Sequence, residues 1–128
     1  MQRASSLQGV SHMRIDVNTF IGNYPFRELH HHAPADLLRA MDRCDIDQAW
    51  ISNLPALFWR DPSPGNTLLF EVAAAEPRLL PVPTIHPELP GWQTLVADAQ
   101  RRGAPALRAA PHLTGTTPAG PEMRALVT

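Results

Sequence analysis

Two histidines and two arginines carry side chains that could transfer protons or bind an anion. His86 and His112 could serve as a general acid or base, because imidazole exchanges protons near neutral pH. Arg27 and Arg108 could bind a substrate carboxylate, since a guanidinium presents parallel N–H donors to such a group. A surface ion pair is the alternative for Arg27. Acid–base and anion-binding chemistry is therefore the first hypothesis.

Asn18 and Phe20 are the candidates for a substrate pocket. They lie in a segment, 13–20, whose apolar residues alternate as in a β-strand. In a regular strand Asp16, Asn18 and Phe20 share one face, so we expect all three to point inward together. Asn18 and Phe20 then either line a pocket or fill the interior of the fold.

Other reactive residue types have structural explanations. Adjacent histidines cannot all converge on one ion from a regular element, so the run 30–32 predicts a solvated loop. Asp42, Asp45 and Asp47 surround a predicted turn from helix to strand, and we interpret them as caps and solvated charge. Cys44 is the one cysteine, which excludes an internal disulfide and a multi-cysteine metal site. We expect it to be buried and inert.

The composition excludes several classes of protein. The chain has 128 residues, 44% of them hydrophobic, and its 11 basic and 12 acidic side chains give a net charge of −1. This suits one soluble domain and leaves no excess of positive charge for a nucleic-acid partner. No run approaches the roughly 18 apolar residues of a membrane span, and residues 1–9 lack the apolar stretch of a secretion signal. We expect a cytoplasmic protein without a membrane partner and with a flexible tail at 1–12.

Strand and helix patterns alternate along the rest of the chain. Asn66 is a plausible N-cap for the second helix. Pro81 and Pro83 lack the N–H that a strand ladder needs, so hydrogen bonding on their side should begin only after Pro83. The predicted strands are 13–20, 46–52, 79–86 and 105–109, and the predicted helices are 34–44, 67–76, 92–102 and one that starts at 121.

Such alternation predicts a parallel α/β sheet covered by helices. One architecture is a complete, small doubly wound domain. The other is the first half, about four βα units, of a (β/α)₈ TIM barrel with outer helices, because such a barrel spends about 31 residues on each unit. We favour a partial barrel over 13–128 that is truncated in its fourth helix. In both architectures ligands bind at the carboxyl ends of the strands, which selects Asn18, Phe20, His86, Arg108 and His112.

Four segments resemble the amidohydrolase-related TIM-barrel family, also called metal-dependent hydrolases. IDVNTFIG at 15–22 resembles its first strand, and LLRAMDRCDIDQAWI at 37–51 its first helix and second strand. LPVPTIHP at 80–87 and ALRAAP at 106–111 resemble its third and fourth strands. The resemblance implies hydrolysis or decarboxylation, often around a divalent metal. Metal-binding relatives carry His-x-His in the first strand, where this chain has Asn18 and Phe20, so that metal site is absent as such and the cofactor is unknown.

We therefore expect an amidohydrolase-like hydrolase, or a decarboxylase or lyase, for a small carboxylate- or amide-bearing molecule. Acid–base work would fall to His86 or His112, and anion binding to Arg108 or Arg27. We expect this chain alone to be inactive. The alternative is a non-catalytic α/β module that binds a small ligand or associates with itself, because exposed strand edges favour a homo-oligomer.

Overall fold

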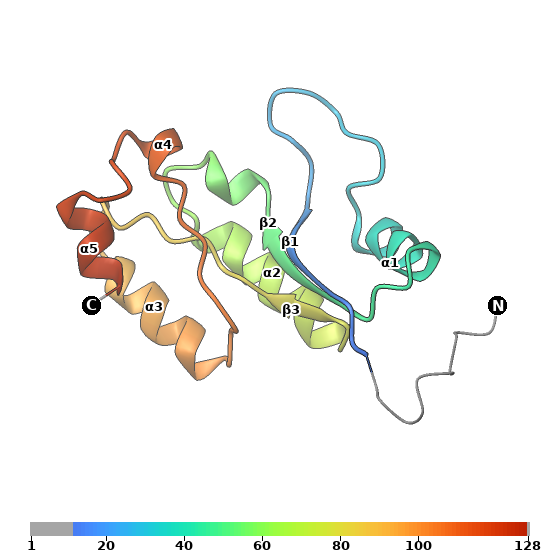
Figure 1. Ribbon diagram of the computed structural model, residues 1–128. Helices are drawn as coiled ribbons and strands as arrows, with labels where there is room; N and C mark the ends of the chain where they lie inside the picture. Colours follow the sequence, from blue (N-terminus) through green and yellow to red (C-terminus); the bar gives the residue numbers. More distant parts are fainter. Residues whose placement is uncertain (1–11, 128) are drawn as a thin grey trace.

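The computed structural model describes residues 12–127 and shows a parallel sheet flanked by helices (Figure 1). The sheet has three strands in the order β1-β2-β3. Among the described residues no helix is long and apolar enough to cross a membrane. The tail predicted at 1–12 falls outside the described residues except for His12. The elements are β1 Ile15–Ile21, α1 Pro34–Arg43, β2 Gln48–Asn53, the 3₁₀ helix η1 Pro55–Leu57, α2 Ser63–Ala75, β3 Leu79–Pro81, α3 Trp92–Arg101, α4 Pro111–Thr114 and α5 Pro121–Val127.

One face of the sheet packs against α1 and α2. Met41 of α1 and Leu69 of α2 form a buried cluster with strand residues that include Ile51 and Leu79. Each fully buried side chain of this size contributes roughly 1.5–3 kcal/mol to folding. Because strand side chains alternate between faces, the neighbours of these residues must point to the opposite side of the sheet.

The fourth strand, predicted at 105–109, is reduced to a single parallel bridge between Thr84 and Arg108. The N–H of Arg108 donates to the carbonyl of Pro83 over 2.9 Å, and the N–H of Ile85 donates to the carbonyl of Arg108 over 2.8 Å. The first N–H that donates to this segment is thus that of Ile85, after Pro83, as predicted from the missing N–H groups of Pro81 and Pro83, although the carbonyl of Pro83 already accepts. The prediction of a full fourth strand is wrong, because the two prolines leave so little of the ladder to pair with.

β1 contains a bulge that changes which of its side chains share a face. Asp16 pairs with Ala49 and Thr19 with Ile51, so one residue more stands on β1 than on β2 between these pairs. Asp16 therefore lies on the helix-covered face, while Phe20, paired with Ser52, lies on the other. The expectation that Asp16, Asn18 and Phe20 face inward together is wrong, because it assumed a regular strand.

Asn66 does not cap α2, which begins three residues earlier, at Ser63. Its side chain instead donates to the carbonyl of Thr84 and accepts from the N–H of Thr84, both over 2.8 Å. Since β2 ends at Asn53, the carboxamide of Asn66 takes the place of a strand beside Thr84. This contact ties the start of α2 to the end of the sheet.

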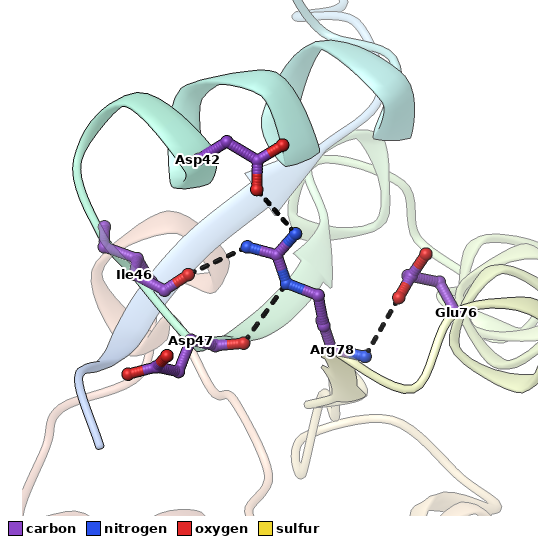
Figure 2. A network of polar contacts seen from close by, with 5 residues as sticks. All are labelled: Asp42, Ile46, Asp47, Glu76 and Arg78. Carbon is purple, nitrogen blue, oxygen red and sulfur yellow. Dashed lines mark hydrogen bonds and ion pairs between the residues drawn. The ribbon is translucent and has the colours of Figure 1, made fainter. Parts of the chain in front are cut away.

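Arg78 joins three segments at the amino end of the sheet (Figure 2). Its guanidinium donates to the carbonyl of Ile46 over 2.9 Å, to the carbonyl of Asp47 over 3.3 Å and to the carboxylate of Asp42 over 2.8 Å. The carboxylate of Asp47 accepts from the N–H of Arg14 over 2.8 Å. Asp42 and Asp47 therefore have structural roles at this end of the sheet.

Candidate functional site

Arg108 lies across the face of the sheet that α1 and α2 leave uncovered, among three side chains from other segments. Its Nε donates to the hydroxyl of Ser52 over 2.8 Å, and its Nη1 donates to the side-chain carbonyl of Asn18 over 2.9 Å. Its Cζ lies 4.6 Å from the centre of the Phe20 ring, a cation–π distance. Three of the predicted site residues, Asn18, Phe20 and Arg108, are thus brought together.

The sheet positions this cluster by register. Phe20 and Ser52 are paired on β1 and β2, so their side chains point the same way, opposite to the buried Ile51. The bulge in β1 sets Asn18 at the edge of this group, with its N–H bonded to the carboxylate of Asp16 over 3.0 Å. The bridge at Thr84 then aligns Arg108 with the two strands. The cluster therefore depends on residues 90 positions apart in the chain.

Ser52 is the residue of this cluster that the sequence analysis did not identify. It is completely buried, and its hydroxyl donates to the carbonyl of Val82 over 2.7 Å. With its proton committed there, the oxygen can only accept from Arg108 Nε, which fixes the direction of the guanidinium. The available signal was its place at the end of the second predicted strand, at 46–52.

The charge of Arg108 is not neutralised by a neighbouring carboxylate within the part of the chain that the structure describes. Its acceptors, Ser52 and Asn18, are both neutral. Partial burial lowers the pKa of Arg108, because desolvation disfavours the charged form, but a guanidinium stays charged at neutral pH. Of the five N–H groups of an arginine, these two bonds use two and leave three for a ligand. The arrangement can bind an anion.

The same residues do not fit a divalent metal. The side-chain oxygen of Asn18, the one donor atom at the family's first-strand positions, already accepts from the guanidinium of Arg108. Phe20 offers no ligand atom, and a fixed positive charge lies over its ring. No group of three or more His, Cys, Asp or Glu residues within 12–127 could hold a metal ion.

His86 is buried, with 3% of its surface exposed, in the segment between β3 and the turn that begins at Pro87. Its Nε2 lies 3.1 Å from the carbonyl of Ala56 and 3.0 Å from the carbonyl of Trp59. These bonds hold the loop after η1, and they account for one ring nitrogen. The other, Nδ1, is buried without a partner among the described residues.

The remaining predicted residues lie elsewhere. Arg27 and His112 are exposed, the first in the loop after β1 and the second on α4, and neither side chain has a hydrogen bond or ion pair within the described residues. His30 and His31 are exposed on the predicted loop. Cys44 is also exposed, so the expectation of a buried thiol is wrong. The residue is the C-cap of α1 and lies beyond the face of that helix that packs on the sheet.

Comparisons with known proteins give one informative match. No protein-family model matches the sequence, and no curated protein matches it. Among solved structures, the chain is similar to 5-carboxyvanillate decarboxylase LigW2 from Novosphingobium aromaticivorans DSM 12444, with bound manganese and 3-methoxy-4-hydroxy-5-nitrobenzoic acid. The TM-score is 0.66 at 16% identity, over 91% of this chain and 48% of that chain.

That similarity concerns the fold alone. LigW2 is an amidohydrolase-superfamily TIM barrel, and this chain spans about half its length. The predicted α/β class with parallel strands is supported, whereas four complete βα units are not confirmed. The three parallel strands and their helices are consistent with part of a TIM barrel.

Proposed function

We propose that this chain is the first half of an amidohydrolase-like barrel that acts, as a hydrolase or decarboxylase, on a small carboxylate-bearing molecule. Arg108 would bind the carboxylate. The observation that carries this proposal is a half-buried guanidinium held by Ser52, Asn18 and Phe20, with no carboxylate of the described chain beside it.

The desolvation of the half-buried Arg108 guanidinium favours an anion bound beside it. A partly desolvated guanidinium gains most from a charge-assisted hydrogen bond, and a carboxylate can accept two of them in parallel. Phe20 already lies against one face of the guanidinium, which leaves its edge for the ligand. A planar aromatic acid would suit this edge, and the solved neighbour holds a substituted benzoic acid.

His86 and His112 remain the proposed acid–base residues, with different prospects. His112 is exposed on α4, so it can reach a ligand only if the ligand extends over that helix. His86 has its Nε2 committed to two backbone carbonyls, which leaves Nδ1 as its only nitrogen for proton transfer.

Calorimetric titration of the purified chain with benzoate, and with benzamide as its neutral analogue, tests the binding step. We expect saturable binding of benzoate only, weakened at least about tenfold in Arg108→Lys, which keeps the charge but loses the planar fork. Arg43→Gln removes one exposed positive charge at the end of α1 and should leave binding unchanged. Equal binding of benzoate and benzamide would contradict the proposal.

The reaction is tested by release of carbon dioxide from 5-carboxyvanillate by the chain, with and without Mn²⁺. Decarboxylation that Arg108→Lys abolishes would support the catalytic proposal. Benzoate binding without turnover would instead favour a binding module, or a chain that needs the other half of a barrel for catalysis.

A self-associating module is the second candidate, and a specific feature favours it. β1 is the edge of the sheet, and Met13 just before it is 59% exposed, while Ile15 and Val17 on it are 42% and 56% exposed. A strand edge without a partner and with exposed apolar residues readily pairs with another chain.

A further inference from the structure

A hollow of about 520 Å³ lies between the first turns of α2 and α3, apart from the contacts of Arg108. Arg60, Asp61 and Ser63 line one side, Trp92 and Thr94 line the other, and His86 lines it as well. Each helix follows a strand of a parallel sheet, so both helices begin at the carboxyl end of the sheet, where ligands of such folds bind.

The hydrogen bonds of His86 determine its tautomer. Nε2 has two carbonyl oxygens, of Ala56 and Trp59, within 3.1 Å, and a carbonyl can only accept. In the neutral ring Nε2 therefore carries the proton, and Nδ1 is a lone-pair acceptor. Nδ1 is buried without a partner among the described residues, and an unmet buried acceptor is costly. Because Nε2 is turned to the loop at 56–59, Nδ1 is the ring nitrogen left for a ligand that donates a proton.

Donors and positive charge surround the same hollow. The first amides of a helix have no intrahelical acceptor, and no side chain caps α3, whose N-cap is Gly91. Thr94 contributes a hydroxyl, and the exposed guanidinium of Arg60 has no partner within the described residues. The positive ends of both helix dipoles, about half a charge each, point toward the hollow.

Asp61 is the one acidic side chain among the residues that line the hollow, and its carboxylate is already hydrogen-bonded to Ser63. Its carboxylate accepts from the N–H of Ser63 over 2.9 Å. The backbone N–H and the hydroxyl of Ser63 hold the pKa of Asp61 below its usual value. The acid thus offsets Arg60, and the two helix ends leave the hollow positive by about one charge.

We propose that this hollow binds a phosphate group that still carries a proton, as inorganic phosphate or a phosphate monoester. The phosphate oxygens accept from the α3 amides, Thr94 and Arg60, and the P–OH proton is donated to Nδ1 of His86. The second pKa of phosphate monoesters is near 6, so the protonated form is present around neutral pH. Trp92, beside the hollow, gives the apolar part of an ester a surface to pack on. This site does not depend on the proposed role of Arg108.

The proton on the ligand should make the site bind phosphate more tightly than anions that carry no proton. Sulfate has the same shape and charge range but no proton at neutral pH, so it meets Nδ1 with a lone pair against a lone pair. We expect phosphate to bind at least about tenfold more tightly than sulfate, a difference of about 1.4 kcal/mol.

Amide NMR of the purified chain tests the proposal at pH 6.5 with inorganic phosphate, phenyl phosphate and sulfate as probes. Saturable shifts of the Trp92 and Gln93 amides with phosphate, and weaker ones with sulfate, are the expected result. The absence of saturation up to tens of millimolar phosphate, or equal affinity for sulfate, would overturn the proposal.

Two surface variants keep the test independent of folding. Arg60→Gln should weaken phosphate binding about threefold to tenfold, and Asp61→Asn should strengthen it by a similar factor, since each changes one nearby exposed charge. Arg43→Gln removes the same charge far from the hollow and should change nothing. If Arg43→Gln weakens binding as much as Arg60→Gln does, the effect is one of net charge and the site is refuted.

Discussion

Replacing Arg78 with alanine removes the side chain that hydrogen-bonds the α1–β2 turn from the start of β3 (Figure 2). The two bonds to backbone carbonyls contribute roughly 0.5–1.5 kcal/mol each. The ion pair with Asp42 adds about 0–1 kcal/mol, because the Asp42 side chain is 65% exposed and solvent screens it. We therefore expect Arg78→Ala to lower the free energy of unfolding by about 2 kcal/mol.

Urea unfolding followed by far-UV circular dichroism measures this loss. With a slope of about 1–3 kcal/mol per molar urea, the midpoint should fall by about 1 M. Arg101→Ala is the matched control: it breaks an exposed pair with Asp98 on α3 and should cost at most about 0.5 kcal/mol. If the two variants lose the same stability, the carbonyl bonds of Arg78 contribute nothing and the reasoning is refuted.

Three further changes have defined outcomes. Asn66→Ala removes both bonds to Thr84 and should cost about 2–3 kcal/mol in urea unfolding, whereas a loss below about 0.5 kcal/mol would mean that water replaces the carboxamide. The lowered pKa of Asp61 means that its contribution to stability is present above the ordinary carboxyl range and is lost as the pH falls through the folded value. Thermal unfolding against pH should therefore show a shallower acid loss in Asp61→Asn than in the parent, and identical profiles would argue against this contribution. Val17→Lys places a charge on the exposed edge of β1 and should shift any self-association seen by light scattering toward the monomer, and an unchanged mass would show that β1 is not the contact.

Much of the fold follows from local pattern. The helix predicted at 92–102 is observed as α3, Trp92–Arg101, and Gly103 just beyond its end lies in the left-handed region at φ 71°. The strand at 105–109 was predicted from composition in the same way, but a strand needs a partner with free N–H groups. Pro81 and Pro83 lack these N–H groups, so the segment at 105–109 finds little to pair with. The composition of 105–109 alone does not show this.

The candidate site was predictable in part. Asn18, Phe20 and Arg108 follow from the rule that ligands bind where parallel strands end. Ser52 and the orientation of Asp16 depend on the register of β1 against β2, and a bulge shifts that register without leaving a sequence signal. His86 has the predicted position, yet its hydrogen bonds to the loop after η1 could not be anticipated, because they join residues 27 and 30 positions apart.

The Nε–H signal of Arg108 in a ¹H–¹⁵N spectrum, followed while benzoate is added, tests the central claim most directly. The bond to Ser52 protects this proton from rapid exchange with water, so the signal should be observable in the free chain. Saturable displacement of the signal by benzoate but not by benzamide is the result predicted for a carboxylate on the guanidinium. A signal that stays in place while benzoate binds elsewhere, or does not bind, would contradict the account.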